Sequence, residues 1–320
     1  MRIIAIEEHF TLPGRTVSNP IIRERFRARL RHDLDAESVD LGGSRIAAMD
    51  AAGVTMQVLS CTGIQALEAE VAVLVARETN DAAHAAVQRH PDRFAAFAAL
   101  PTADPVAAVR EFERAVATLG FRGAMIGNHT RGEYMDDRKF WPIFEYAESV
   151  DLPIYLHPSA PHPLAMQAYF KGFEDIATAP WGYAIDTATH FLRLVFAGVF
   201  DAFPRLKLIL GHYGEGIPFW ITRTNAHTAF NAKKRGLKHE YQDYVRNNLW
   251  VTCSGHFNQP AFLCTLMMMG IDKIMFAVDW PFEDNRVAVD HLMHLPVSEA
   301  DRARVAHGNA ESLLRLPSGR

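Results

Sequence analysis

The sequence predicts an α/β protein folded as a (β/α)8 (TIM) barrel. Eight short apolar runs alternate with longer stretches of helical periodicity. The runs are continuously apolar, which is typical of parallel strands buried on both faces. The chain has 320 residues, of which 49% are hydrophobic, and one barrel domain spanning residues 1–320 is expected at this length. Closure into a barrel is the simplest arrangement of eight such strands.

The predicted strands are rich in β-branched and other apolar residues and are bounded by turn or polar residues. They occupy residues 3–6, 55–60, 94–100, 123–127, 153–157, 206–211, 249–254 and 273–279. An open doubly wound sheet is the alternative fold, but no glycine-rich phosphate loop follows the first strand. The barrel is therefore preferred.

The clearest helix is predicted over residues 104–119. Asp104 and Pro105 are its start signals, and Gly120 is its stop signal. Its apolar side is predicted to carry Val106, Val109, Phe112 and Val116. Further helices are predicted over residues 66–90, 139–150 and 185–203.

Two connections are longer than a plain barrel loop, namely residues 15–40 after the first strand and residues 159–181 after the fifth. Both follow the carboxyl end of a strand. Loops at this end form the mouth of a barrel, so both are interpreted as lids or walls of a binding pocket. The predicted fold therefore carries loop insertions at its C-terminal face.

Composition argues against several classes of partner. The net charge is −4 and the longest basic cluster is Lys233-Lys234-Arg235, so a nucleic-acid surface is not expected. No stretch approaches the ~20 apolar residues of a membrane span, and residues 1–6 are too short for a signal-peptide core. Cys61, Cys253 and Cys264 are odd in number and widely spaced. A reduced, cytoplasmic setting is expected, with Cys61 and Cys253 as buried fillers.

Candidate metal ligands follow four of the predicted strands. Glu7 and His9 are two residues apart, so they share one face of an extended chain. His157 ends the fifth strand before a proline, and Asp279 ends the eighth. Imidazole and carboxylate together can form a mixed shell for zinc or manganese. The pattern predicts a metal site at the mouth of the barrel.

The sixth strand ends at His212, and Glu215 lies three residues further on. The two can form an oriented acid/base pair. Each of these signals has a common alternative: a surface turn for Glu7 and His9, a hydrogen-bonded core histidine for His157, and a helix N-cap for Asp279. Their shared position at strand ends favours the metal site over these separate explanations.

Four motifs carry a family resemblance: Glu7-Glu8-His9-Phe10, Tyr155-Leu156-His157-Pro158, Gly211-His212 with Gly214-Glu215-Gly216, and Asp279-Trp280-Pro281-Phe282. The chain resembles the amidohydrolase superfamily over nearly its whole length. Within that superfamily it is most similar to the metal-dependent nonoxidative decarboxylases, which include the γ-resorcylate, 2,3-dihydroxybenzoate, 5-carboxyvanillate and aminocarboxymuconate semialdehyde decarboxylases. The resemblance implies an amidohydrolase-like barrel and a metal-dependent carboxy-lyase.

The resemblance also implies the composition of the site. Glu7, His9, His157 and Asp279 would hold one Zn²⁺ or Mn²⁺ per subunit, without an organic cofactor. The first motif departs from the superfamily's usual His-x-His, and a carboxylate in place of imidazole makes the site harder and leaves the choice of metal open. His212 and Glu215 would lie beside the ion, and Arg223 would reach into the pocket. The family suggests a homodimer or homotetramer.

The implied reaction removes CO₂ from an aromatic, phenolic carboxylic acid, with Asp279 protonating the ring carbon. Two rival functions remain open. One is hydrolysis of a lactone or amide by metal-activated water, with His212 as the base. The other is a binding or scaffold protein with an inactive barrel. The intact set of ligand residues argues against this function.

Further residues are candidates for the mouth of the pocket. His190 and Arg193 either line it or form a solvated helical face, and Ser254 either binds substrate or belongs to a plain loop. Aromatic side chains can wall the pocket for an aromatic substrate or belong to the core. They are Phe10, Phe170, Trp181, Trp280 and Phe282.

Overall fold

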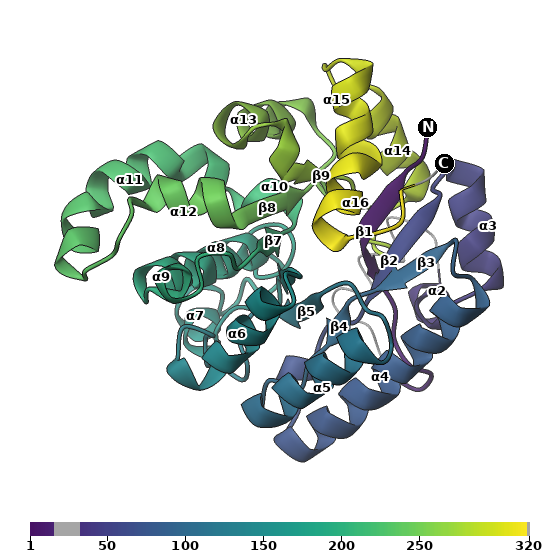
Figure 1. Cartoon of the computed structure of the whole chain (residues 1–320), viewed down its shortest axis with the longest axis horizontal. Helices are drawn as coiled ribbons and strands as arrows, with labels where there is room; N and C mark the ends of the chain where they lie inside the picture. Colours follow the sequence, from purple (N-terminus) through teal and green to yellow (C-terminus); the bar gives the residue numbers. More distant parts are fainter. Residues whose placement is uncertain (16–32, 319–320) are drawn as a thin grey trace.

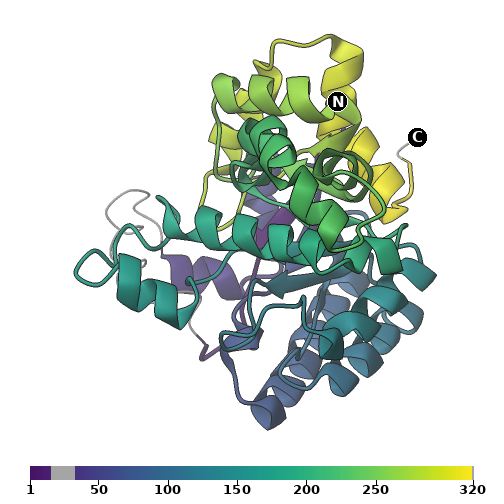
Figure 2. The ribbon, with the colours of Figure 1, turned by 90° about the vertical axis from the view of Figure 1, so that its left-hand side faces the viewer.

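The computed structural model describes residues 1–15 and 33–318. The strands lie at the centre of the molecule, and helices surround them (Figure 1). A view turned by 90° shows helices outside the strands in that direction also (Figure 2). The strands are β1 (Ile4–His9), β2 (Met56–Ser60), β3 (Phe94–Ala96), β4 (Ala98–Ala99), β5 (Ala124–Gly127), β6 (Ile154–His157), β7 (Leu208–Leu210), β8 (Leu249–Thr252) and β9 (Ile274–Met275).

The α-helices are α2 (Leu34–Val39), α3 (Gly43–Ala52), α4 (Ala69–Arg89), α5 (Pro105–Ala117), α6 (Trp141–Ser149), α7 (Pro163–Tyr169), α8 (Gly182–Phe196), α9 (Val199–Ala202), α10 (His212–Glu215), α11 (Ile217–Lys234), α12 (Tyr241–Asn248), α13 (Gln259–Met269), α14 (Asn285–Met293), α15 (Glu299–Ala303) and α16 (Asn309–Leu314). Shorter helical turns are η1 (Ile64–Ala66), η2 (Arg138–Phe140), η3 (Ile271–Lys273) and η4 (Arg304–Gly308). Within the part of the chain that the structure describes, no helix is both long and apolar enough to cross a membrane.

All strand pairs are parallel, in the orders β1-β2-β3 and β4-β5-β6-β7-β8-β9. β3 and β4 are two halves of the strand predicted over residues 94–100. The last strand segment returns to β1, because Ile6 N donates to Phe276 O at 3.3 Å and Asp279 N donates to Glu7 O at 3.0 Å. The ring of strands is therefore closed, and the predicted barrel is confirmed.

Alternation along each strand separates two buried layers. Ile4 and Ile6 of β1 share one hydrophobic cluster with Tyr155 and Ile209, and this cluster fills the barrel interior. Ala5 belongs to the larger cluster that includes apolar residues of the surrounding helices. The strands are thus buried on both faces, which explains their continuously apolar sequences.

Helix α5 confirms the helix predicted over residues 104–119 and its start signal. The Asp104 side chain accepts hydrogen bonds from the backbone N–H groups of Val106 and Ala107, at 3.1 and 3.0 Å. The predicted apolar side was wrong at Val106, which is 64% exposed. The helix instead buries small residues, Ala107, Ala108 and Ala115, beside Phe112, because alanines let it pack closely on the barrel.

The helix predicted over residues 185–203 is two helices, α8 and α9. The break lies at Gly198, whose φ of 81° is the left-handed conformation that glycine adopts without strain. The predicted loop 159–181 contains the short helix α7. Most of the predicted lid 15–40 lies outside the described residues, apart from its end, which forms α2.

Candidate metal centre

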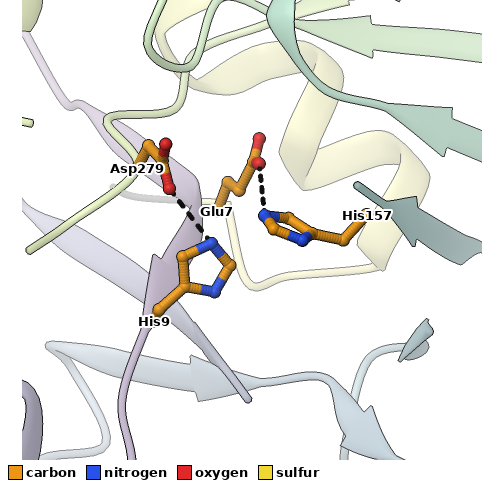
Figure 3. Close-up of side chains that lie close together, drawn as sticks. All are labelled: Glu7, His9, His157 and Asp279. Atoms are coloured by element: carbon orange, nitrogen blue, oxygen red, sulfur yellow. Dashed lines mark ion pairs between the residues drawn. The ribbon is translucent and has the colours of Figure 1, made fainter. Parts of the chain in front are cut away.

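Four side chains that are far apart in the sequence meet at one end of the barrel (Figure 3). Glu7 and His9 come from β1, His157 ends β6, and Asp279 follows β9. Each offers one nitrogen or oxygen atom, and these atoms lie within 4.8 Å of one another. His9 Nε2 is 3.1 Å from Asp279 Oδ1, and His157 Nε2 is 3.2 Å from Glu7 Oε1. The four donor atoms therefore surround one centre.

The donor set fits a divalent metal ion. Glu7 Oε1, His9 Nε2 and Asp279 Oδ1 are buried and have no hydrogen-bond partner among the described residues. Buried polar atoms are rarely left in this state, because an unpaired one costs about 1–3 kcal/mol. Two imidazole nitrogens and two carboxylate oxygens suit Zn²⁺ or Mn²⁺. Such an ion would satisfy all of these atoms at once.

A shift in strand register turns Glu7 and His9 toward the interior. Ala5 pairs with Gln57 but Glu8 pairs with Leu59, so β1 carries one extra residue between these pairs. Ile4 and Ile6 already face the interior, and strict alternation would send Glu7 to the helix side. The extra residue acts as a β-bulge and reverses the direction of the side chains that follow it. The side chains of Glu7 and His9 therefore face the barrel interior, and that of Glu8 faces the helices.

The second ring nitrogen of each ligand histidine is held by the protein. His157 Nδ1 lies 2.7 Å from Pro158 O. A carbonyl only accepts, so Nδ1 carries the proton and Nε2 is left as a lone-pair donor. His9 Nδ1 lies 3.0 Å from Ser60 Oγ. Both rings are thus fixed with Nε2 toward the centre.

The second oxygen of Glu7 is held by three hydroxyl groups. Tyr155 and Ser254 donate to Oε2, and Thr252 Oγ1 donates to it at 3.1 Å. Gly211 lies against the same oxygen, since a Cβ atom at this position would be 2.9 Å from Glu7 Oε2. These contacts fix the direction of the carboxylate and leave Oε1 facing His157 and the shared centre.

A tight turn places His212 and Glu215 beside the cluster. His212 Nδ1 is 2.7 Å from Glu215 Oε1, and His212 Nε2 is 3.8 Å from Asp279 Oδ2. His212, Tyr213 and Glu215 all have positive φ, at 51°, 55° and 54°. Non-glycine residues in this region cost of order 1–3 kcal/mol each and concentrate at functional sites. The turn is held in this conformation although its backbone is strained.

The charges of the cluster match those of a metal-binding set. Burial raises the pKa of Glu7, but the adjacent His157 and the charge of His212 outweigh burial and hold the pKa below its usual range. Burial likewise acts against the charge of Asp279, and its contacts with His212 and His9 keep its pKa low. Burial and the neighbouring His157 lower the pKa of His9. Carboxylates are thus ionised and His9 is neutral, as ligands must be.

His212 differs from His9 in its electrostatics. Burial lowers the pKa of His212, but the charge of Glu215, the nearby carboxylate of Asp279 and the hydrogen bond with Glu215 raise it well above its usual value. These neighbours favour the protonated imidazole, in which one N–H group faces Asp279 and the other faces Glu215.

The remaining predicted site residues lie at different distances from the cluster. The Phe282 ring centre is 5.9 Å from that of His9. Arg223 lies on α11 and is exposed, and its contact with a substrate stays a prediction. Phe10, Phe170 and Trp280 are buried, whereas Trp181 is 58% exposed and belongs neither to the core nor to an enclosed wall.

His190 is a buried residue, so its assignment to the pocket mouth or to a solvated face was wrong. It is 0% exposed, accepts from Met135 N at 2.9 Å and pairs with Asn128 Oδ1 at 2.9 Å. Arg193 on the same helix is partly exposed and pairs with Asp136. Ser254 contacts Glu7 and therefore belongs to the support of the ligand set.

The two cysteines expected to be fillers are free thiols. Burial raises the pKa of Cys253 to about 12 and that of Cys61 to about 11. Neither is activated as a nucleophile, because the thiolate is the reactive form.

Sequence reasoning missed the residues that hold the ligands. Tyr155 precedes His157 by two positions, so period-two alternation puts both on the same face of β6, and this signal was available. Thr252, the last residue of β8, and Ser254, two residues beyond it, show the same spacing. Gln57 and Arg45, which lie behind β1, gave no such signal because they belong to separate segments.

Residues 9–316 match the model of the amidohydrolase family. Together with the closed parallel barrel and its strand-end ligands, this match shows that the chain belongs to that family. The fold class predicted from the strand pattern and the resemblance drawn from the four motifs are both confirmed.

Relatives that match the chain over nearly its full length include decarboxylases of aromatic acids. A γ-resorcylate decarboxylase from Polaromonas sp. (strain JS666 / ATCC BAA-500) is 35% identical and is aligned over 98% of this chain and 98% of its own. The structure of a dihydroxybenzoic acid decarboxylase from Polaromonas sp. JS666, with bound manganese and the inhibitor 2-nitroresorcinol, has a TM-score of 0.89 at 34% identity and covers 99% of this chain and 98% of that chain. A 5-carboxyvanillate decarboxylase from Sphingomonas paucimobilis has a TM-score of 0.88 at 34% identity over 99% of both chains.

Proposed function

We propose that this protein is a metal-dependent carboxy-lyase that removes CO₂ from a hydroxylated aromatic carboxylic acid. The observation that carries the proposal is the convergence of four donor atoms within 4.8 Å, most of them without a hydrogen-bond partner among the described residues. The decarboxylases that match the chain over nearly its full length support this class of reaction.

We assign Glu7, His9, His157 and Asp279 as ligands of one Zn²⁺ or Mn²⁺. When bound, the ion would supply a Lewis acid for the substrate carboxylate and the adjacent oxygen. The manganese bound in the related decarboxylase supports a divalent ion here. The protein's contribution is to hold the ligands before the ion arrives, so that binding requires little rearrangement.

The proton chemistry is assigned to Asp279 and His212. His212 Nε2 faces Asp279 Oδ2 at 3.8 Å, and Glu215 orients the ring from the other side. His212 passes its proton to the ionised Asp279, Asp279 delivers this proton to the ring carbon that bears the carboxylate, and solvent then returns a proton to His212. The new C–H bond makes this carbon tetrahedral. The C–C bond then breaks, its electron pair restores the aromatic ring, and CO₂ leaves.

Two residues are proposed to bind the substrate. Phe282 packs its ring beside His9 and would form an apolar wall against an aromatic ring. Arg223 would pair with an anionic group of the substrate, because its planar guanidinium suits a carboxylate. Replacing Arg223 by Ala should raise KM more than it lowers kcat.

We also propose that the chain forms a homodimer or homotetramer. Helix α11 exposes Phe219, Trp220 and Phe230, which are 72%, 51% and 79% exposed, and exposed apolar patches mark protein interfaces. Sedimentation of the purified protein measures its mass. A monomer at micromolar concentration would contradict this part of the proposal.

A panel of hydroxylated benzoates tests the reaction. The protein is purified without chelator, supplied with Mn²⁺ or Zn²⁺, and assayed for CO₂. We expect CO₂ to equal the loss of substrate and one ion to bind per chain. Lactones and amides test the rival: hydrolysis adds water and leaves the carbon count unchanged. Such products without CO₂, or a protein that binds no ion, would overturn the proposal.

A further inference from the structure

Behind the metal centre, on the helix side of β1, lies a chain of buried polar side chains. Glu8 and Gln57 are 0% exposed and Arg45 is 1% exposed. Arg45 Nε donates to Gln57 Oε1 at 2.7 Å, and Gln57 Nε2 donates to Glu8 Oε2 at 3.2 Å. Burying a guanidinium and a carboxyl group is costly unless both are hydrogen-bonded. The burial of these two groups together with the Gln57 amide indicates a specific role.

Glu8 holds the backbone on both sides of Asp279. Val278 N donates to Glu8 Oε1 at 2.8 Å, and Trp280 N donates to Glu8 Oε2 at 3.4 Å. Asp279 itself has a φ of 79°, a conformation that a non-glycine residue keeps only where its surroundings impose it. The carboxyl group of Glu8 therefore fixes the two peptide groups that determine where the Asp279 side chain points.

Arg45 holds the other ligand-bearing segment. Its Nη1 donates to the backbone carbonyl of His9 at 2.9 Å, while its Nε reaches Gln57. Because Arg45 comes from helix α3, the contact ties His9 to an element outside the strand ring. One continuous chain of hydrogen bonds thus connects the backbone of His9 with the backbone around Asp279.

We propose that Arg45, Gln57 and Glu8 are positioning residues that set the separation of His9 and Asp279, and with it the affinity of the metal centre. The inference rests on the proposed function only in requiring that the four ligands bind an ion. Outer residues that orient ligands commonly change metal affinity by about 10- to 100-fold when they are replaced.

A buried amide elsewhere in the barrel provides the matched control. Asn80 is 1% exposed, donates to Ala99 O at 3.0 Å and accepts from Ala99 N at 2.8 Å. Like Gln57, it is a buried amide with hydrogen bonds at both ends, but it holds β4, which carries no metal ligand. Asn80→Leu should therefore destabilise the fold without altering the geometry of the centre.

The test compares Glu8→Gln, Gln57→Leu and Asn80→Leu. In Glu8→Gln the new NH₂ group takes the place of one carboxyl oxygen. In one orientation it faces the N–H of Val278, and in the other it faces the donors from Trp280 and Gln57. Two donors cannot bond to each other, so contact is lost in either orientation. The apparent dissociation constant for Mn²⁺ is measured with a competing chelating dye, and the unfolding temperature is recorded for each variant.

We expect Glu8→Gln and Gln57→Leu to weaken Mn²⁺ binding by about 10- to 100-fold, and Asn80→Leu to bind Mn²⁺ as the wild type does. If either test variant fails to fold, the other decides. Wild-type affinity in the folded test variants, or an equal loss in Asn80→Leu, would overturn the inference. A wild-type protein that binds Mn²⁺ but releases no CO₂ would refute the proposed function and leave this inference standing.

Discussion

Asp279 combines two tasks in one carboxylate. Oδ1 points to the shared centre with His9, whereas Oδ2 faces His212. The two oxygens therefore separate ligand binding from proton transfer. An amide at this position keeps an oxygen for the ligand task but cannot carry a transferable acidic proton.

Replacing Asp279 by Asn should retain a bound ion and lower kcat by about 10²- to 10⁴-fold, the usual contribution of a general acid. Single-turnover assays of CO₂ release and metal analysis of the same preparation measure both quantities. Turnover within about tenfold of the wild type would remove Asp279 from the proton-transfer step.

The hydroxyl group of Tyr155 is the clearest support of a single ligand, because it donates to Glu7. Tyr155→Phe should lower the free energy of unfolding by about 1 kcal/mol and weaken Mn²⁺ binding several-fold or more. Tyr146→Phe is the control, since Tyr146 is on α6 and packs its ring on Phe112. Chelator competition and denaturant titration measure the two effects, and equal Mn²⁺ affinity in both variants would contradict the assignment.

At the scale of elements, the end of β7 must approach the ligand strand closely. Gly211 has φ −71° and ψ −176°, which alanine also adopts, so substitution there tests space alone. Its added Cβ would lie 2.9 Å from Glu7 Oε2 and 3.1 Å from Ser254 Oγ. The absence of a side chain at Gly211 is thus what allows Glu7 and Ser254 to meet.

Gly211→Ala should cost about 1–3 kcal/mol of stability, as overpacking does, and should displace Glu7 and weaken metal binding. Gly43→Ala is the control, because a Cβ there meets nothing within 4 Å. Unfolding curves with and without Mn²⁺ distinguish the two losses. A variant at Gly211 with unchanged stability and affinity would show that this contact is not tight.

Helix α8 is joined to the loop after β5 through His190. Burial, together with the charges of His129 and Arg193, lowers the pKa of His190 to about 3. The folded state therefore prefers the neutral imidazole, which accepts from Met135 N. Below pH 6.5, the ordinary pKa of histidine, His190 is protonated in the unfolded chain but stays neutral in the folded protein. The free energy of unfolding therefore decreases as the pH falls from about 6.5 toward 3.

His190→Gln removes this titration. The wild type should be the more stable protein at pH 7, and its advantage should shrink by about 2 kcal/mol by pH 5. Denaturant unfolding at both pH values gives the difference. An advantage that stays constant between pH 7 and pH 5 would mean that His190 does not titrate in this way.

At the scale of the whole molecule, the strand pattern was sufficient to predict the barrel, because parallel strands with both faces buried are continuously apolar. It also predicted which strand ends carry Glu7, His9, His157 and Asp279. The inward direction of Glu7 was not predictable, since it depends on one extra residue in β1 relative to β2. Register is a property of two paired strands and does not appear in either sequence alone.

Contacts between residues far apart in the chain could not be predicted from the sequence either. Arg45 gave no signal in the sequence, yet it is buried and binds the carbonyl of His9. Val106 was predicted to be buried from its periodicity but is exposed, because close packing of alanines decides how α5 lies on the barrel. That residues 1–320 form one domain stays a prediction.

The most direct measurement is anomalous diffraction from a crystal of the protein grown with Mn²⁺. The structure predicts one strong peak, at about 2.0–2.2 Å from an atom of each of Glu7, His9, His157 and Asp279, the usual length of such bonds. A peak elsewhere, or a centre that stays free of the ion at saturating Mn²⁺, would contradict the account.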